Sequence, residues 1–179
     1  MRRAWVCLTL VSWILVGCEP AEPGAGNPAS PPSPGLTVAD IEIVEGQTVF
    51  VPAYSHVNYY IEGKTYLLAA TLSIRNTDPM HSITIESVDY FDSNGALVQR
   101  FLEQPMSMPP MGSTEFFVEQ ADQRGGSGAN FIVNWIAAQP VYEPVIEAVM
   151  VGTSGTLGIA FHSEGRVYGE RTSRERYAP

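Results

Sequence analysis

The chain has 179 residues, two cysteines and a net charge of −9 at pH 7. This length has room for one ordinary domain with its own core, together with tails. The acidic balance argues against a nucleic-acid partner, because phosphate groups would repel such a surface.

Residues 1–17 have the pattern of an exported leader. Arg2 and Arg3 give the start a positive charge, and the uncharged apolar run that follows ends at Val16. This run of about 13 residues is too short to cross a hydrocarbon core, which needs roughly 20. At its end, Leu15-Val16-Gly17-Cys18 resembles the lipobox of bacterial lipoproteins, in which the cysteine thiol is acylated and the chain is cut before it. The alternative is an ordinary signal peptide with a chance cysteine near the cut.

Lipidation of Cys18 would tie the mature chain to a membrane, because several acyl chains anchor far more firmly than one. Cleavage would leave 8 of the 10 basic residues against all 19 acidic ones, a net charge of −11. It would also remove Cys7, so that the domain carries no free cysteine. Glu19 stands where an aspartate tends to retain lipoproteins in the inner membrane of enteric-type bacteria. We therefore expect the cell envelope, with the outer membrane favoured over the inner one.

Residues 18–35 are expected to form a linker that begins at the lipidated cysteine. Six prolines stand among Gly, Ala, Ser and Asn, with no apolar period to bury: Pro20, Pro23, Pro28, Pro31, Pro32 and Pro34. In an extended form at about 3.1 Å per residue, such a segment holds a domain up to about 50 Å from the bilayer.

Residues 36–168 are predicted to form an all-β domain, because short β-rich runs alternate with turn residues and no helix-length apolar stripe occurs. Their spacing favours an immunoglobulin-like antiparallel β-sandwich. The expected strands are Ala39–Val44, Thr48–Val51, Tyr66–Arg75, Ile83–Phe91, Leu97–Phe101, Thr114–Glu119, Asn130–Ala137, Val145–Val151 and Leu157–His162. A short final strand and a charged tail, residues 169–179, are expected to follow.

Five local features sharpen this prediction. Alternation in Tyr66–Arg75 places Leu68, Ala70, Leu72 and Ile74 on one face, and a change of phase in Ile83–Phe91 predicts a bulge near Glu86-Ser87. Asn94-Gly95 favours a type I′ hairpin turn. The proline-rich run Pro105 to Gly112 suits a crossing between sheets, and Asn130–Ala137, apolar on both faces, suits a central strand.

A glycine-rich segment is the first candidate for binding, through Gly125, Gly126, Gly128 and Asn130. A phosphate loop would need a helix after the glycines, and a β-like run follows instead. The two remaining interpretations are a turn whose glycines allow positive φ, which is favoured, and a loop that binds a ligand or partner.

An aromatic run is the second candidate, through Tyr54, His56, Tyr59 and Tyr60. Exposed aromatic loops often bind partners, whereas tyrosines that cover the end of a sandwich are commoner. Ser55 and His56 are neighbours in sequence, and adjacency alone gives no nucleophile and base geometry.

Metal and acid-base chemistry find little support in the sequence. The three histidines, His56, His81 and His162, have no spacing typical of a metal site, so neither a metal nor a cofactor is expected. The carboxylates cannot be paired at the separations that glycosidases need. Asp78, Asp89, Asp92 and Asp122 are therefore interpreted as solvated surface groups.

Four segments form a distinctive set: Val51-Pro52-Ala53-Tyr54-Ser55-His56, Thr71 to Asp78, Gly125 to Phe131 with Val133 and Trp135, and Pro144 to Val149. Together they resemble a bacterial family, the domain-of-unknown-function family numbered 3124. The resemblance spans roughly Val49 to Val167 and is specific as a set, although each piece alone is not. It implies no activity.

We expect a non-enzymatic lipoprotein that contacts another envelope protein or a cell-wall component through loops at one end of its sheets. The alternative is a small-ligand-binding or hydrolytic domain that uses His56, Asp122 and Arg124. A third possibility is a domain that only spaces or stabilises an assembly.

Overall fold

The computed structural model describes residues 43–59 and 63–170. The predictions for the leader, Cys18, the linker, Tyr60 and the last nine residues lie outside these ranges. Within the described ranges, no helix is long and apolar enough to span a bilayer.

Twelve strands make up the described part of the chain. They are β1 (Glu45–Pro52), β2 (His56–Asn58), β3 (Thr65–Leu67), β4 (Ala69–Arg75), β5 (Ile83–Phe91), β6 (Leu97–Arg100), β7 (Met106–Met108), β8 (Ser113–Val118), β9 (Asn130–Ala137), β10 (Val145–Ser154), β11 (Leu157–Glu164) and β12 (Arg166–Glu170).

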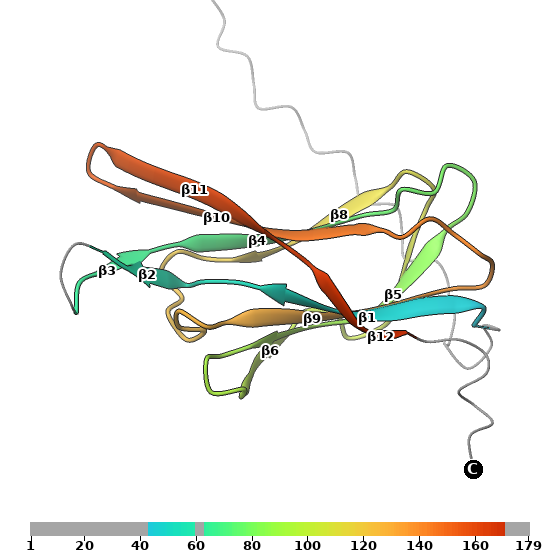
Figure 1. Cartoon of the computed structure of the whole chain (residues 1–179), viewed down its shortest axis with the longest axis horizontal. Coiled ribbons are helices and arrows are strands. Elements are labelled where there is room, and N and C mark those ends of the chain that lie inside the picture. Colours follow the sequence, from blue (N-terminus) through green and yellow to red (C-terminus); the bar gives the residue numbers. More distant parts are fainter. Residues whose placement is uncertain (1–42, 60–62, 171–179) are drawn as a thin grey trace, which may run out of the picture. The chain divides into compact units, whose positions relative to one another are not determined.

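The strands form two antiparallel layers and a small third sheet (Figure 1). The first layer has the order β12-β1-β9-β5-β6, with β7 also paired to β5. The second has the order β11-β10-β4-β8, and β2 pairs with β3 alone. The chain changes layers at Gly165, where β11 ends and β12 begins. The predicted all-β antiparallel class is confirmed, and the immunoglobulin-like topology stays a prediction.

The core lies between the two layers because alternate residues of each strand point inward. In β4 the predicted inward row is confirmed, since Ala70, Leu72 and Ile74 are fully buried, and Leu68 before it is buried too. Facing them, β9 contributes Phe131, Val133 and Trp135, all without exposed surface. The prediction of a central strand at 130–137 is also confirmed, because β1 and β5 flank β9 on its two sides.

The predicted bulge is present, because the β5–β9 register shifts between Ile85 and Ser87. The run from Pro105 to Gly112 does cross from one layer to the other, as expected. The expectation that a crossing suits it better than a strand is corrected in part, because Met106–Met108 forms β7 and pairs with β5. The turn at Asn94-Gly95 joins β5 and β6 as expected, but it is not type I′. Gly95 has a φ of 80°, whereas Asn94 is not among the residues with positive φ. A type I turn closed by a glycine bulge fits the bond from Gly95 N–H to the Asp92 carbonyl, 3.0 Å long.

Three other expectations are corrected. The single strand Tyr66–Arg75 is two strands, β3 and β4, because Leu68 leaves the ladder and donates its N–H to the Ser55 carbonyl at 2.9 Å. His56 lies in β2 and not in a loop. Of the strand expected at 39–44, Ile43 and Val44 are described and are not in a strand, since β1 begins at Glu45.

Candidate functional site

The two predicted binding segments meet at one end of the sandwich. Ser55, which follows Tyr54, donates its N–H to the Gly126 carbonyl at 3.0 Å and its hydroxyl to the same oxygen at 3.1 Å. On the other side, Gly128 N–H donates to Ser93 Oγ at 2.9 Å. The glycine-rich segment therefore joins the turn after β1 to the β5–β6 hairpin.

Residue 125 must be a glycine because its backbone lies very close to the Tyr90 side chain. A Cβ on this residue would lie 1.9 Å from Tyr90 Oη, and the next residue, Gly126, has a φ of 77°. Tyr90 is fully buried, and its hydroxyl has no hydrogen-bond partner among the described residues. Burial, reinforced by the negative charge of Asp122, raises the pKa of Tyr90 to about 12. These contacts favour the structural interpretation of the glycines, and a binding role for Gly125, Gly126, Gly128 and Asn130 stays a prediction.

The aromatic candidates pack against neighbouring strands with part of their surface exposed. The Tyr54 ring contacts Phe161 of β11 edge-on, with centroids 5.7 Å apart. Tyr59 contacts Tyr66 at 5.5 Å and is 46 % exposed. His56 Nδ1 lies 3.5 Å from Ser55 Oγ. These residues therefore cover the end of the sandwich, and part of their surface still faces solvent.

The residues of the hydrolytic alternative already have partners. Asp122 and Arg124 bond to each other, with Arg124 Nη2 2.6 Å from Asp122 Oδ2. The guanidinium lowers the pKa of the Asp122 carboxyl. A carboxylate held in this state is a weak general base at neutral pH.

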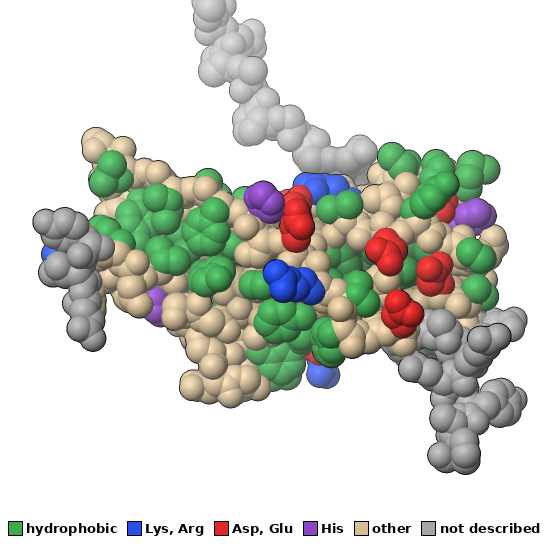
Figure 2. All heavy atoms as spheres, viewed as in Figure 1, with side chains coloured by type: hydrophobic (Ala, Val, Ile, Leu, Met, Phe, Trp, Pro, Cys, Tyr) green, Lys and Arg blue, Asp and Glu red, His purple; other side chains and the backbone are tan. Residues whose placement is uncertain are grey.

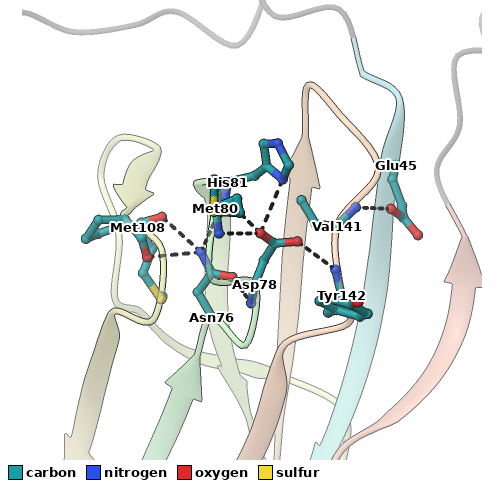
Figure 3. A network of polar contacts seen from close by, with 9 residues as sticks. Glu45, Asn76, Asp78, Met80, His81, Met108, Val141 and Tyr142 are labelled. Atoms are coloured by element: carbon teal, nitrogen blue, oxygen red, sulfur yellow. Dashed lines mark hydrogen bonds and ion pairs between the residues drawn. The ribbon is translucent and has the colours of Figure 1, made fainter.

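The opposite end of the sandwich holds a polar network centred on Asp78 (Figure 3). Asp78 is only 4 % exposed, so its interpretation as a solvated surface group is wrong. Its Oδ1 accepts the N–H groups of Met80 and His81, each at 2.8 Å, and its Oδ2 accepts that of Tyr142 at 3.2 Å. These backbone donors, Met80 first, lower the pKa of Asp78. One carboxylate thus joins the β4–β5 loop to the β9–β10 loop.

Asn76 extends this network to a third loop. Its Nδ2 donates to the carbonyls of His81 at 2.8 Å and Pro109 at 3.0 Å, and its Oδ1 accepts Asp78 N–H at 3.0 Å. In the same β7–β8 loop, Met111 donates its N–H to the Asp78 carbonyl and has a φ of 57°. A left-handed conformation is unfavourable for methionine, and strain of this kind occurs where the surroundings hold the backbone in place.

His81 lies at the border of this network, with part of its side chain exposed. Its Nδ1 lies 3.2 Å from Asp78 Oδ1, although without the geometry of a hydrogen bond. The other ring nitrogen points away from Asp78 (Figure 3). The imidazole is therefore oriented by a fixed negative charge.

A pocket of about 450 Å³ lies beside this imidazole and has a mainly apolar lining. Its walls are Asp78, Pro79, Met80, His81, Pro140, Val141 and Tyr142. Val141 is held from a further strand, because its N–H donates to the Glu45 carboxylate at 2.9 Å. An apolar pocket with a few fixed polar groups is the usual form of a ligand site.

Sequence reasoning missed this site because Tyr142 lies 64 residues from Asp78, and no periodic pattern joins them. One local signal was present. An Asn or Asp just before a proline favours a turn in which the side chain accepts a nearby backbone N–H, and Asp78 precedes Pro79. Within residues 43–59 and 63–170, no group of three His, Asp or Glu side chains could hold a metal ion.

The fold and the site define a small all-β domain of two packed sheets with a preformed pocket at one end. A family model described as "Protein of unknown function (DUF3124)" matches residues 46–168. The chain belongs to this family. Among curated proteins, no sequence matches it. A solved structure from Thermotoga maritima, titled "Crystal Structure of Thermotoga maritima 1070", is similar with a TM-score of 0.41 and 12 % identity, over 67 % of this chain and 92 % of that one.

Proposed function

We propose that this protein is a lipid-anchored, non-enzymatic binding module of the bacterial cell envelope, and that its ligand occupies the pocket beside His81. The binding role is supported by one observation: a mainly apolar pocket lies beside His81, and the buried Asp78 orients the His81 ring. The lipobox at Cys18 supports the anchor.

The state of Asp78 supports binding over catalysis. Its two oxygens accept three backbone N–H groups, and its pKa is lowered. An efficient general base has a pKa near the working pH, and a carboxylate stabilised in this way is far from it. Asp78 therefore serves to hold two loops and one imidazole in place, which is the arrangement of a preorganised binding site.

The lining of the pocket indicates the chemistry of the ligand. Met80 and Tyr142 are 75 % and 68 % exposed, so large apolar surfaces stand at the rim. The His81 ring is partly exposed and has one nitrogen directed away from Asp78 (Figure 3), so it adds a group that can form a hydrogen bond. A peptide or cell-wall segment with an apolar or aromatic group next to a polar atom fits this combination.

The anchor is tested by fractionating cells that produce the full chain or its Cys18→Ser variant. The proposal predicts the full chain in the membrane fraction and the variant in the soluble envelope fraction. An unmodified amino terminus on the native protein, or equal membrane retention of the variant, would overturn the anchor.

The pocket is tested separately with the soluble Cys18→Ser chain. Its co-sedimentation with isolated cell-wall sacculi and its capture of envelope proteins are compared with those of the Tyr142→Ala and His81→Ala variants. Tyr168→Ala is the matched control, because Tyr168 is a tyrosine of similar exposure, 64 %, in β12. Loss of binding in the pocket variants alone supports the proposal, and equal binding by all four chains contradicts it.

A further inference from the structure

The β10–β11 hairpin has an uncharged surface on an acidic protein. From Ala148 to Ser163 the chain contains no Asp, Glu, Lys or Arg. Several of its apolar side chains face solvent, with Leu157 67 %, Val151 45 % and Ile159 37 % exposed. Figure 2 shows hydrophobic side chains over this end of the visible face, while acidic ones lie toward its middle and opposite end. Contiguous apolar surface of this kind marks an interaction site.

Strand β11 also has an unpaired edge. Among the described residues it is the terminal strand of its sheet and pairs only with β10, in eight consecutive pairs without a bulge. Natural proteins protect such edges with charges, prolines or bulges. The other terminal strands of the two main layers follow this rule: β8 contains Glu115, β6 ends at Arg100, β12 begins at Arg166, and β7 lies between Pro105 and Pro109. In β11 the only charged residue is Glu164, at its end.

We propose that β11 pairs with β11 of a second copy of this chain, antiparallel and around a two-fold axis at Ala160. Residues directly opposite each other in an antiparallel pair share a face. Phe161 and Ile159 lie opposite Met150 and Gly152, both buried, and therefore share the inner face. An axis at Ala160 places Ile159 opposite Phe161 of the second copy, and the reverse. Two such aromatic and β-branched pairs stabilise the contact.

The distribution of charge favours a second copy as the occupant. Two copies of a protein with a net charge of −9 repel each other over most approaches. Along this edge the only charged groups are the two Glu164 carboxylates. With the axis four residues away, they lie about 26 Å apart along the strands, well beyond the Debye length of about 8 Å at physiological ionic strength. The pairing thus avoids the repulsion that other faces would meet.

Contacts with neighbouring residues already fix the β10–β11 hairpin in the conformation that this pairing needs. Tyr66 donates its hydroxyl to the Leu157 carbonyl at 2.8 Å, which fixes the start of β11 against the core. The Tyr54 ring packs edge-on against the Phe161 ring. Because the strand is already extended and ordered, pairing costs little conformational entropy. The result is a continuous sheet of eight strands, four from each copy.

Cysteine cross-linking tests this arrangement, because the chain has only Cys7 in the leader and Cys18 at the lipobox. In Ala160→Cys the two thiols face each other across the axis, where Cα atoms of opposite residues lie about 4.5–5.5 Å apart, a separation that suits a disulfide. Oxidation of native membranes should yield a species of twice the mass that a reductant reverses. His162→Cys, on the same face of the same strand, should give little product because its copy is about 13 Å away.

Three outcomes overturn the proposal: no cross-link at residue 160, a cross-link to a protein of another mass, or equal yields from Ala160→Cys and His162→Cys. Phe117→Cys on β8, at the other edge of the sheet, and the parent chain should both remain uncross-linked. A charge exchange gives an independent measure. Ala160→Lys and Ala160→Glu should each weaken self-association by about two- to fivefold, because like charges then lie directly opposite, and mixing the two variants should restore it. Failure of the mixture to associate contradicts the register.

Discussion

At both ends of the sandwich, side-chain hydrogen bonds join separate loops, but one end is closely packed and the other has a pocket. At one end, Ser55, Ser93 and the glycine-rich segment bond to one another, and Tyr90 fills the space beneath them. At the other end, Asp78 and Asn76 also join separate loops, and these loops line a solvent-open pocket beside His81. The glycine-rich end is therefore closely packed, whereas the end with the buried aspartate has a pocket beside its loops.

The largest effect is expected at the packed end. In Gly125→Ala the new Cβ would overlap Tyr90 Oη and lie 2.8 Å from Ala129 Cβ. Overpacking of this kind should lower the free energy of unfolding by about 2–3 kcal/mol. Gly128→Ala is the matched control, because its nearest neighbour would be Ser93 Oγ at 3.3 Å. Thermal unfolding of both variants measures the difference, and equal melting temperatures would show that the glycines are not needed for packing.

A smaller loss is expected at the pocket end, and it depends on pH. The pKa of Asp78 is lowered from its ordinary value of 3.8. Its contribution to stability is therefore complete above that value and is lost as the pH falls through the lower pKa of the folded state. Asp78→Asn should reduce the melting temperature at pH 7 and flatten its decline below about pH 4. An unchanged acid profile would show that the carboxylate charge does not hold the loops.

Ser93→Ala tests the bond network of the packed end without overlap. The Ser93 hydroxyl donates to the Gly125 carbonyl at 3.1 Å and accepts Gly128 N–H at 2.9 Å. Removal of both bonds should cost about 1–2 kcal/mol, since each such partly exposed hydrogen bond contributes about 0.5–1 kcal/mol. Hydrogen exchange should show faster exchange at Gly128 and unchanged rates at Met80 and His81. Faster exchange at both ends would mean that the two loop clusters are not independent.

The smallest effect is a gain in stability. Met111 has a φ of 57° and a side chain that is 69 % exposed. Glycine adopts this conformation freely, and Met111→Gly should raise the free energy of unfolding by about 0.5–1 kcal/mol after the entropy cost of glycine. Chemical denaturation of the parent chain and of Met111→Gly measures this change in the free energy of unfolding. A loss of stability would show that the methionine side chain supports the pocket end.

Local patterns in the sequence predicted much of the fold. Alternation identified the inward row of β4, and the change of phase in β5 identified its bulge. The predicted turn type at Asn94-Gly95 was wrong because this dipeptide favours a hairpin turn without determining its type. The Asp92 carboxylate accepts the N–H groups of Asn94 and Ala96, and these bonds favour the longer turn with a glycine bulge.

The pocket could not be predicted in the same way. It depends on contacts between residues distant in sequence, such as Asp78 with Tyr142 and Asn76 with Pro109. The short β2–β3 pair was missed for a similar reason, since Leu68 leaves its strand to bond Ser55. Such contacts depend on which loops come together in the folded chain, and they leave no periodic pattern in a single sequence.

Hydrogen exchange of the soluble Cys18→Ser chain, with and without isolated envelope material, tests the central claim most directly. A ligand beside His81 should slow amide exchange in residues 77–82 and 140–143 and leave residues 125–130 unchanged. Slower exchange confined to residues 125–130, or no change at either end, would contradict the assignment of the ligand site to the pocket.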